Sequence, residues 1–449
     1  MRSSRIPFTV HILSPVTERG ATRIERDSLG PVEVPADALY GAHTVRGVAN
    51  FRLSGVTMAA RPDLIAALAH VKAAAAGANL LCGALEPEIA NALIAAARAV
   101  ATGAHDDQFP VDVVHGGGGT VINMNVNEVL ANLAGEALGG RRGGYDRVHP
   151  NDHANRSQST NDVYPTALAL ATVRVGARAA AGLDVLAGAL ETKAQERGGH
   201  KRLGRTCLQD AVPLTIGDTH GAQAHAVRRT TAALRRSLGE LLAVPLGATA
   251  VGTGIGTPAG YREHAVRLLA EECGLAVTPA EDMFDALANL DGYVDVAAQA
   301  VRCALVIAKI ASDVRLLSSG PLGGFGELTL PAVQVGSSIM PGKINPAIPE
   351  LVMQVSFEVR GAAAIVEAAA AAGELELNVM EPVIARHLHG SLADLGAVAE
   401  RFAERSIAGL VWNDDALERN LAGSFGGAVE DAVRDGYVAV AAQHHRPER

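Results

Sequence analysis

The chain has 449 residues, which is long enough to bury a large core and to form two or three subdomains. Hydrophobic residues make up 48% and charged residues 19%, a balance that indicates a soluble globular protein and excludes a disordered one. A net charge of −9 disfavours nucleic acids and anionic membranes as partners. It also makes any local cluster of cations better suited to an anionic ligand.

Cysteine usage and the apolar runs indicate the compartment. The four cysteines are far apart and form no C-x-x-C pair, which predicts free thiols in a reducing compartment. The first 19 residues contain no continuous apolar stretch, so we expect no signal peptide. Charged residues interrupt the long apolar runs, at Arg174 and Arg178 and at Arg302 and Lys309, so we expect no membrane span. Together these features predict a cytoplasmic protein.

Helical periodicity dominates the chain. Residues 1–24 look like a loose extension, and residues 24–54, with their Pro and Gly stops, predict irregular structure with a small hairpin. In the later segments apolar residues recur at i, i+3 and i+4, which predicts helices over residues 62–77, 87–103, 164–194, 213–242, 286–318, 348–372 and 384–407. Strand-like alternation is nearly absent, so the predicted fold class is all-α.

Several predicted helices exceed about 25 residues without internal caps, which is typical of a long-helix bundle or a helical repeat. Aromatic residues make up only 3%, while alanine and glycine are abundant, so the bundle can pack closely against copies of itself. We expect a mostly helical N-terminal domain over residues 1–158, a central long-helix bundle over 159–413 and a shortened C-terminal segment over 414–449.

The segment 336–346, with the sequence GSSIMPGKINP, is the most informative loop. Its Gly and Pro residues exclude a regular helix or strand, and Ser337 and Ser338 stand together within it. Lys343 and Asn345 follow at close range and offer a positive charge and amide donors for a carboxylate. For this pattern alone, an ordinary surface loop is the alternative interpretation.

Further polar segments separate the predicted helices. The glycine run 116–119 ends in Thr120 at the start of a helix, which suggests an anion cradle or else a flexible turn. Ser159, Thr160 and Asn161 come together before another helix, where an N-cap needs only one such residue. The excess of hydroxyl and amide groups favours a ligand site.

Other site chemistries are not supported by the pattern. The glycine run lacks the lysine of a P-loop, and residues 252–256 follow no clear strand, so we expect no nucleotide or other cofactor. The histidines have no matching ligand set at metal spacing, and no G-x-S-x-G elbow occurs. The polar loops, including a further one with Thr206 and Cys207, suit a dianionic carboxylate substrate whose charge increases in the transition state.

Taken together, these motifs resemble the aspartase/fumarase superfamily over roughly residues 24–422. The segment 336–345 matches the superfamily signature G-S-S-x-M-P-x-K-x-N without a gap. Residues 149–162 and 204–211 resemble the other two signature segments of the superfamily. Three long motifs in the right order make this resemblance specific.

The resemblance implies an all-α fold in three parts and a homotetramer whose active sites combine loops from three subunits. The implied reaction is an anti-elimination across C2–C3 of a 2-substituted succinate, giving fumarate through an enediolate intermediate. The segments 344–350 and 375–383 resemble the aspartase branch, whereas fumarases usually differ at both points.

Family roles carry over onto the matching residues. Ser337 would be the general base that takes the C3 proton, and its activation would depend on the surrounding loop. Lys343 and Asn345, with Thr206, would bind the C1 carboxylate, and Asn161 would face the leaving group. The C4 carboxylate, where charge accumulates, would be held by Thr120, Ser159, Thr160 and the Ser338 region.

Two departures from the family concern the substrate and the C-terminus. Cys207 stands where family members carry a histidine, which helps to hold the substrate in aspartases, and a thiol has neither its reach nor its proton chemistry. The chain also ends soon after Gly427, so we expect a short third subdomain. Cys207 favours nitrosuccinate, because nitrite leaves as a stable anion and no ammonium group must be recognised. The main prediction is therefore conversion of nitrosuccinate to fumarate and nitrite.

Three alternatives stand beside this prediction. Overall similarity favours an aspartate ammonia-lyase, and Cys207 opposes it. A fumarase, or another lyase of the superfamily, is opposed by the aspartase-like segments. A catalytically silent structural homologue is opposed by the presence of Ser337, Lys343 and Asn345.

Overall fold

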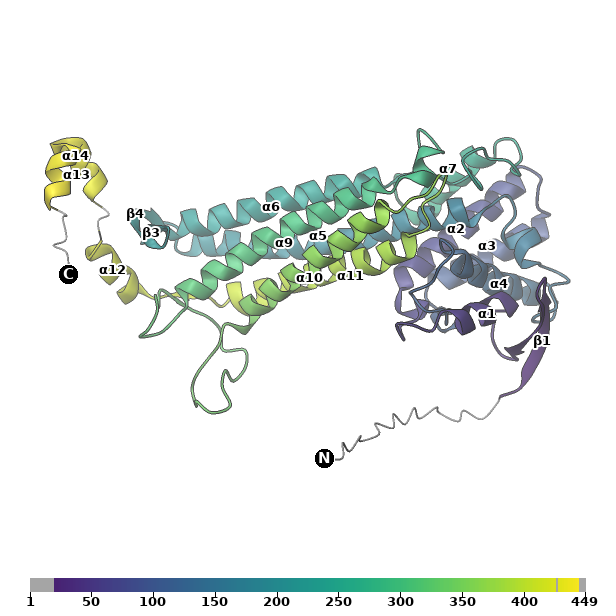
Figure 1. Cartoon of the computed structure of the whole chain (residues 1–449), viewed down its shortest axis with the longest axis horizontal. Helices are drawn as coiled ribbons and strands as arrows, with labels where there is room; N and C mark the ends of the chain where they lie inside the picture. Colours follow the sequence, from purple (N-terminus) through teal and green to yellow (C-terminus); the bar gives the residue numbers. More distant parts are fainter. Residues whose placement is uncertain (1–19, 425–426, 444–449) are drawn as a thin grey trace, which may run out of the picture.

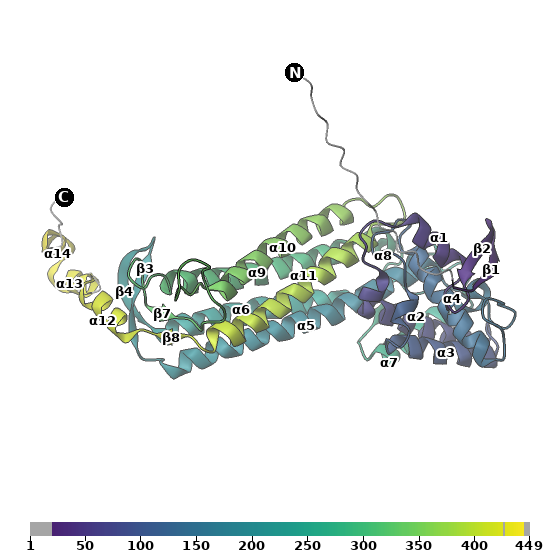
Figure 2. The same ribbon diagram turned by 90° about the horizontal axis from the view of Figure 1, so that it is seen from below.

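Five long helices form an elongated bundle in the structure, a computed structural model that describes residues 20–424 and 427–443 (Figure 1). These helices are α5 (Thr160–Glu196), α6 (Ile216–Glu240), α9 (Asp291–Leu317), α10 (Ala347–Ala370) and α11 (Glu381–Phe402). A cluster of shorter helices covers one end of the bundle, and three short helices lie at the other end (Figures 1 and 2). The predicted all-α long-helix fold is confirmed.

Small residues allow the bundle helices to approach closely. Helices α5 and α11 cross where a Cβ atom on Gly182 would lie 2.4 Å from the carbonyl oxygen of Gly396. A Cβ atom on Gly396 would lie 2.7 Å from the Cα atom of Ala179. The two backbones are therefore in direct contact, which longer side chains at these positions would prevent.

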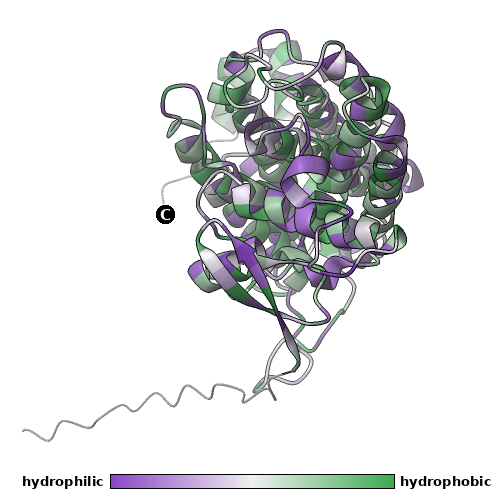
Figure 3. Ribbon diagram, turned by 90° about the vertical axis from the view of Figure 1, so that its right-hand side faces the viewer, coloured by the Kyte–Doolittle hydropathy of each residue, from purple (hydrophilic) through white to green (hydrophobic). Residues whose placement is uncertain are grey.

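An antiparallel ribbon and four helices form the N-terminal end. Strand β1 (Thr22–Asp27) pairs with β2 (Gly30–Pro35) and forms a small hairpin, as predicted. The helices are α1 (Ala42–Asn50), α2 (Pro62–Leu81), α3 (Pro87–Ala101) and α4 (Thr120–Ala137). Helix α7 (Tyr261–Cys273) returns to this end and packs on α2 (Figure 1). Seen end-on, hydrophilic segments lie in front of helices with long hydrophobic stretches (Figure 3).

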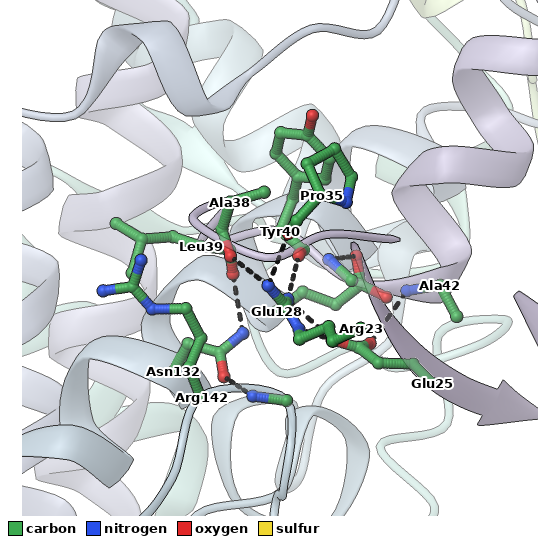
Figure 4. A network of polar contacts seen from close by, with 12 residues as sticks. Arg23, Glu25, Pro35, Ala38, Leu39, Tyr40, Ala42, Glu128, Asn132 and Arg142 are labelled. Atoms are coloured by element: carbon green, nitrogen blue, oxygen red, sulfur yellow. Dashed lines mark hydrogen bonds and ion pairs between the residues drawn. The ribbon is translucent and has the colours of Figure 1, made fainter. Parts of the chain in front are cut away.

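A buried carboxylate fastens the start of α1 to α4. Glu128 on α4 is 4% exposed and accepts hydrogen bonds of 2.8, 2.9 and 3.2 Å from three backbone N–H groups around the start of α1. Burial raises the pKa of Glu128, and these hydrogen bonds oppose the rise. Beside it, Glu25 accepts a hydrogen bond from the N–H of Ala42 at 3.0 Å and pairs with Arg23 at 2.7 Å (Figure 4). This network positions α4.

The predicted helix over residues 213–242 begins later, as α6, because a hairpin precedes it. Strand β3 (Lys201–Thr206) pairs with β4 (Gln209–Thr215), and the hydroxyl of Thr215 caps α6. Strand β4 is largely exposed, so it lacks the apolar–polar alternation of a half-buried strand. For that reason the sequence did not predict this hairpin.

Short elements complete the described part of the chain. They are η1 (Met58–Ala60), η2 (Asp106–Gln108), η3 (Pro150–Ala154), β5 (Ala243–Val244), β6 (Thr278–Pro279), α8 (Asp285–Ala288), β7 (Leu328–Thr329), η4 (Ala403–Ile407), β8 (Val411–Trp412), α12 (Asp414–Ala422), α13 (Ala428–Asp435) and α14 (Tyr437–Gln443). Strands β7 and β8 pair with each other and connect the segment after α9 to the segment before α12. The segment 414–449, predicted to be short, contains three small helices where it is described.

Helix α2 bears on the expectation that the chain has no membrane span. By length and composition alone it could cross a membrane, although the sequence predicted no such segment. Within the structure, 72% of its most apolar 18-residue stretch is buried, which is typical of the core helix of a globular protein. A single lysine, Lys72, lies in the middle of this helix and is buried with it.

The variant Gly182→Ala tests the close crossing of α5 and α11. The added methyl group would overlap the backbone of Gly396, so we expect the free energy of unfolding to fall by about 1–3 kcal/mol. Gly188→Ala on the same helix is the matched control, since no atom lies within 4 Å of its Cβ position. There the higher helix propensity of alanine should raise stability by up to about 1 kcal/mol. Equal stabilities of the two variants in chemical denaturation would contradict the close crossing.

Candidate active site

Thr120 begins helix α4 after a glycine loop of defined shape. Gly117, Gly118 and Gly119 have φ angles of 83°, 58° and 89°, and a Cβ atom on Gly119 would lie 2.4 Å from the ring of Tyr164. Glycine is therefore required next to Thr120, and packing against Tyr164 determines the path of the loop. The Thr120 side chain is exposed, and its hydroxyl donates to the carbonyl oxygen of Gly117 at 2.9 Å.

The segment 159–161 forms the N-terminus of α5. Ser159 is the N-cap: its hydroxyl accepts a hydrogen bond from the N–H of Asn161 at 3.2 Å, and its own N–H donates to Asp162 at 2.9 Å. The side chain of Asn161 donates to the carbonyl oxygen of Ala250 at 2.8 Å. One member of the predicted polar group thus serves as a helix cap.

The N-termini of α4 and α5 meet at this end of the molecule. The amide of Asn123, in the first turn of α4, donates to the hydroxyl of Thr160 at the start of α5, at 3.1 Å. Unpaired N–H groups give a helix N-terminus a positive partial charge, so two converging N-termini favour an anion. The structure brings together four of the predicted residues here: Thr120, Ser159, Thr160 and Asn161.

A buried polar cluster that the sequence analysis did not predict lies beneath these residues. Lys72 is 2% exposed, and its Nζ donates to the side-chain oxygens of Asn155 at 3.0 Å and Gln158 at 2.9 Å. The same Asn155 oxygen accepts hydrogen bonds of 3.1 Å from the amides of Asn123 and Asn127. The available sequence signals were a lone lysine in an apolar helix and the alternating asparagines of α4.

Asp162 connects the start of α5 to a neighbouring loop. Its buried carboxyl group accepts backbone N–H hydrogen bonds from Ser159 at 2.9 Å and from Gly247 and Thr249 at 3.0 Å each. Burial raises the pKa of Asp162 to about 6, and the three hydrogen bonds and the nearby charge of Lys72 oppose this rise.

Thr206 and Cys207 lie at the tip of the β3–β4 hairpin, at the opposite end of the bundle (Figure 1). Thr206 pairs with Gln209 across a turn in which Cys207 and Leu208 have φ angles of 51° and 59°. Positive φ at both central positions indicates a type I′ turn, for which Asn-Gly is the usual sequence. Cys207 is exposed at this tip.

The loop 336–346, called the serine loop below, also lies at this end, but on a different side from the hairpin (Figure 1). Two hydrogen bonds close its base: the N–H of Gly336 donates to the carbonyl of Lys343 at 2.9 Å, and the amide of Asn345 donates to the carbonyl of Gly336 at 2.7 Å. Ser338 and the Lys343 side chain are exposed. The loop therefore has a defined conformation, as predicted, and the side chain of Lys343 is exposed on it.

Ser337 is held by the backbone of its own loop. Its hydroxyl oxygen accepts N–H hydrogen bonds from Ile339 at 3.3 Å and from Met340 at 3.0 Å. Two N–H donors on one hydroxyl oxygen stabilise the alkoxide more than the neutral hydroxyl. This arrangement favours deprotonation of Ser337.

Glu327 connects the β3–β4 hairpin to the segment that precedes the serine loop. Its carboxylate is fully buried and pairs with Arg205 of the hairpin at 2.5 Å and with Arg202 at 3.6 Å. Asn420 on α12 donates to the same carboxylate at 2.7 Å. A buried carboxylate with three such partners fixes the base of the hairpin relative to the segment that leads into the serine loop.

The predicted site residues therefore form groups at opposite ends of one chain. Helix α5 separates the ends with 37 residues, or about 55 Å at 1.5 Å per residue. Thr120 and the segment 159–161 lie at one end, while the hairpin tip and the serine loop lie at the other. One chain does not bring them together, so a site that contains both groups requires more than one copy.

Comparisons with known proteins identify the family. Residues 30–361 match the sequence profile of the family described as Lyase. The aspartate ammonia-lyase of Escherichia coli K12 is 44% identical over 405 residues, which covers 90% of this chain and 85% of that protein. The chain belongs to the aspartase/fumarase superfamily. Within the superfamily it falls in the aspartase-like branch, and it is a carbon–nitrogen lyase.

Further members of the superfamily support the same placement. The aspartate ammonia-lyase of Pseudomonas aeruginosa is 45% identical over 415 residues, 92% of this chain and 87% of that protein. The fumarate lyase:delta crystallin of Brucella melitensis superposes with a TM-score of 0.92 at 42% identity, covering 94% and 92% of the two chains. The class II fumarase of Schistosoma mansoni gives the same TM-score and coverage at 33% identity. The predicted superfamily, branch and enzyme class are confirmed, whereas these relatives give no support to nitrosuccinate.

Leu208 tests the strained turn at the hairpin tip. Leucine is disfavoured at a φ of 59°, and the side chain is 62% exposed, so Leu208→Gly should stabilise the protein by roughly 0.5–1 kcal/mol. Leu208→Val should destabilise it, because a branched Cβ is less compatible still with this backbone conformation. Thermal unfolding of both variants measures the order. The same midpoint for glycine and valine would show that the turn is not strained.

Proposed function

We propose that this lyase converts L-aspartate to fumarate and ammonia. The observation that carries the proposal is the similarity to aspartate ammonia-lyases over at least nine tenths of the chain, with the serine loop intact. The main prediction from the sequence, nitrosuccinate, depended on Cys207 alone. The comparisons favour the alternative, so aspartate becomes the first substrate.

In the proposed reaction Ser337 is the general base. Its alkoxide takes the proton from C3, and the C–H electron pair moves into the C4 carboxylate to form an enediolate. This pair then forms the C2–C3 double bond while the C2–N bond breaks, which gives fumarate and ammonia. The N–H groups of Ile339 and Met340 support this role, because they stabilise the anionic oxygen.

The polar loops divide the two carboxylates of the substrate between them. Lys343, Asn345 and Thr206 bind the C1 carboxylate, and the second amide hydrogen of Asn345 is available because the first is used at Gly336. Asn161 faces the leaving group. The C4 carboxylate, which gains charge, lies among Thr120, Ser159, Thr160 and Ser338. The converging N-termini of α4 and α5 support this assignment, since fixed N–H dipoles stabilise developing charge.

A homotetramer with shared sites is part of the proposal. The two groups of residues lie at opposite ends of a helix about 55 Å long, so association of copies is the way to bring them together. A cytoplasmic location is also proposed, supported by four cysteines that are free thiols in the structure.

Nitrosuccinate is the second candidate, favoured by one observation. Cys207 is exposed at the hairpin tip next to Thr206, and a thiol offers no imidazole for recognition of an amino group. Because nitrite leaves as an anion, this substrate does not require that recognition.

The variant Ser337→Ala and a substrate panel test the chemistry. Wild-type enzyme should form fumarate and ammonia from L-aspartate, followed by fumarate absorbance and ammonia release. Ser337→Ala should lower kcat by at least about 100-fold, since a general base contributes about 10²–10⁴. Thr192→Ala, an exposed hydroxyl on α5, is the control and should retain full activity.

The products identify the substrate. Nitrite from nitrosuccinate, with slow turnover of L-aspartate, would replace the first proposal with the second. Turnover of malate would indicate a fumarase. An enzyme inactive on the whole panel would indicate a silent homologue, and a fully active Ser337→Ala variant would exclude this serine as the base.

Mixing two inactive variants tests the shared site. Thr160→Ala damages one end of the chain and Ser337→Ala the other, so each homotetramer should be nearly inactive. After joint unfolding and refolding, about a quarter of the sites should combine two intact halves from different subunits and recover activity. Mixtures that stay as inactive as the separate variants would indicate that each site is built within one chain.

A further inference from the structure

Lys72 carries a buried charge that none of the roles above uses. It is 2% exposed in the middle of α2, and its hydrogen bonds in the described part of the chain go to two neutral side chains, those of Asn155 and Gln158. Asp162 acts on it through its charge, but the carboxyl oxygens of Asp162 are occupied by backbone N–H groups. Burial of an ammonium group without a direct carboxylate partner is unfavourable.

A continuous chain of hydrogen bonds leads from Lys72 to the site. Lys72 donates to the side-chain oxygen of Asn155 at 3.0 Å, and the same oxygen accepts from the amide of Asn123 at 3.1 Å. That amide also donates to the hydroxyl of Thr160 at 3.1 Å. The Asn155 amide in turn donates to the carbonyl oxygen of Gln158 at 3.1 Å, immediately before the cap of α5. Lys72 thus supports the segment that presents Thr160.

We propose that Lys72 is a positioning residue for the half-site of the C4 carboxylate, by which we mean Thr120, Ser159 and Thr160 at the N-termini of α4 and α5. Through Asn155 and Asn123 it orients the hydroxyl of Thr160, and its positive charge stabilises the negative charge that the enediolate places on this carboxylate. The inference rests on the function proposed above. A buried ammonium group that donates to neutral side chains within the described residues, close to two helix N-termini, suits a dianion, because all three contributions have the same sign.

The burial of Lys72 is consistent with a binding site in which the anionic substrate stabilises the ammonium form of this lysine. Desolvation lowers the pKa of Lys72 to about 7, and the nearby charge of Asp162 opposes the decrease. A dianionic ligand at Thr160 would favour the ammonium form in the same direction as Asp162.

Lys72→Met is the first test, because methionine keeps the length and apolar stem of lysine but removes the charge and the donors. For L-aspartate we expect kcat to fall about 10- to 100-fold and KM to rise about 3- to 10-fold, since the charge on the C4 carboxylate is greatest in the transition state. Lys309→Met, on the exposed surface of α9, is the control and should leave both constants unchanged. An unchanged kcat per folded tetramer of Lys72→Met, with only lowered thermal stability, would overturn the inference.

Asn155→Asp is the second test if Lys72→Met does not fold. It keeps the oxygen that accepts from Lys72 and gives this lysine a carboxylate partner at the same position, while it removes the amide donor to the carbonyl oxygen of Gln158. We expect unchanged or increased thermal stability with kcat lowered by about tenfold or more, because the lysine charge is neutralised. Full activity of a stable Asn155→Asp variant would overturn the inference.

The binding of fumarate separates this inference from the proposed function. If wild-type enzyme forms no fumarate from L-aspartate, the proposed function fails, and Lys72 is judged by calorimetric titration with fumarate. Lys72→Met, or Asn155→Asp if that variant alone folds, should then raise the Kd for fumarate at least about threefold. Equal affinities of wild type and variant, or a wild type that does not bind fumarate, would overturn the inference.

Discussion

The length of the central bundle is the constraint on which the rest of the structure depends. Helix α5 alone extends about 55 Å, so the polar loops at its two ends cannot meet within one chain. The chain has the serine loop and the β3–β4 hairpin at one end of the bundle and the N-termini of α4 and α5 at the other. Small residues such as Gly182 and Gly396 make the bundle narrow, which is compatible with the proposed association of copies.

Buried charges give the N-terminal end its fixed geometry. Glu128 and Asp162 each accept three backbone N–H groups, and Lys72 donates to neutral amides, so each charge organises irregular backbone rather than pairing directly with an opposite charge. Hydrogen bonds to a charged group are strong, and removing them would leave that charge buried and unsatisfied. The start of α5 at Thr160 is consequently held in place by buried hydrogen bonds.

In the proposed reaction, the residue assigned as base and the residues assigned to the leaving group belong to different elements of the chain. Ser337 is held by N–H groups of its own loop, whereas Cys207 lies at the tip of a different element, and Asn161 lies at the far end of the chain. Under the proposed function, the same elimination can be combined with different 2-substituents by changes at Cys207 or Asn161 that leave the serine loop intact.

The sequence by itself determined the long helices, because a buried helical face leaves a 3.6-residue period, and the serine loop, because Gly and Pro exclude regular structure locally. It also determined the superfamily, through three motifs in the right order. It did not determine α1 or the exposed hairpin β3–β4, whose strands lack alternation. Tertiary structure alone decided the buried contacts of Lys72 and Asp162. Those features depend on contacts between residues up to about 90 positions apart in the chain, and no local pattern records such contacts.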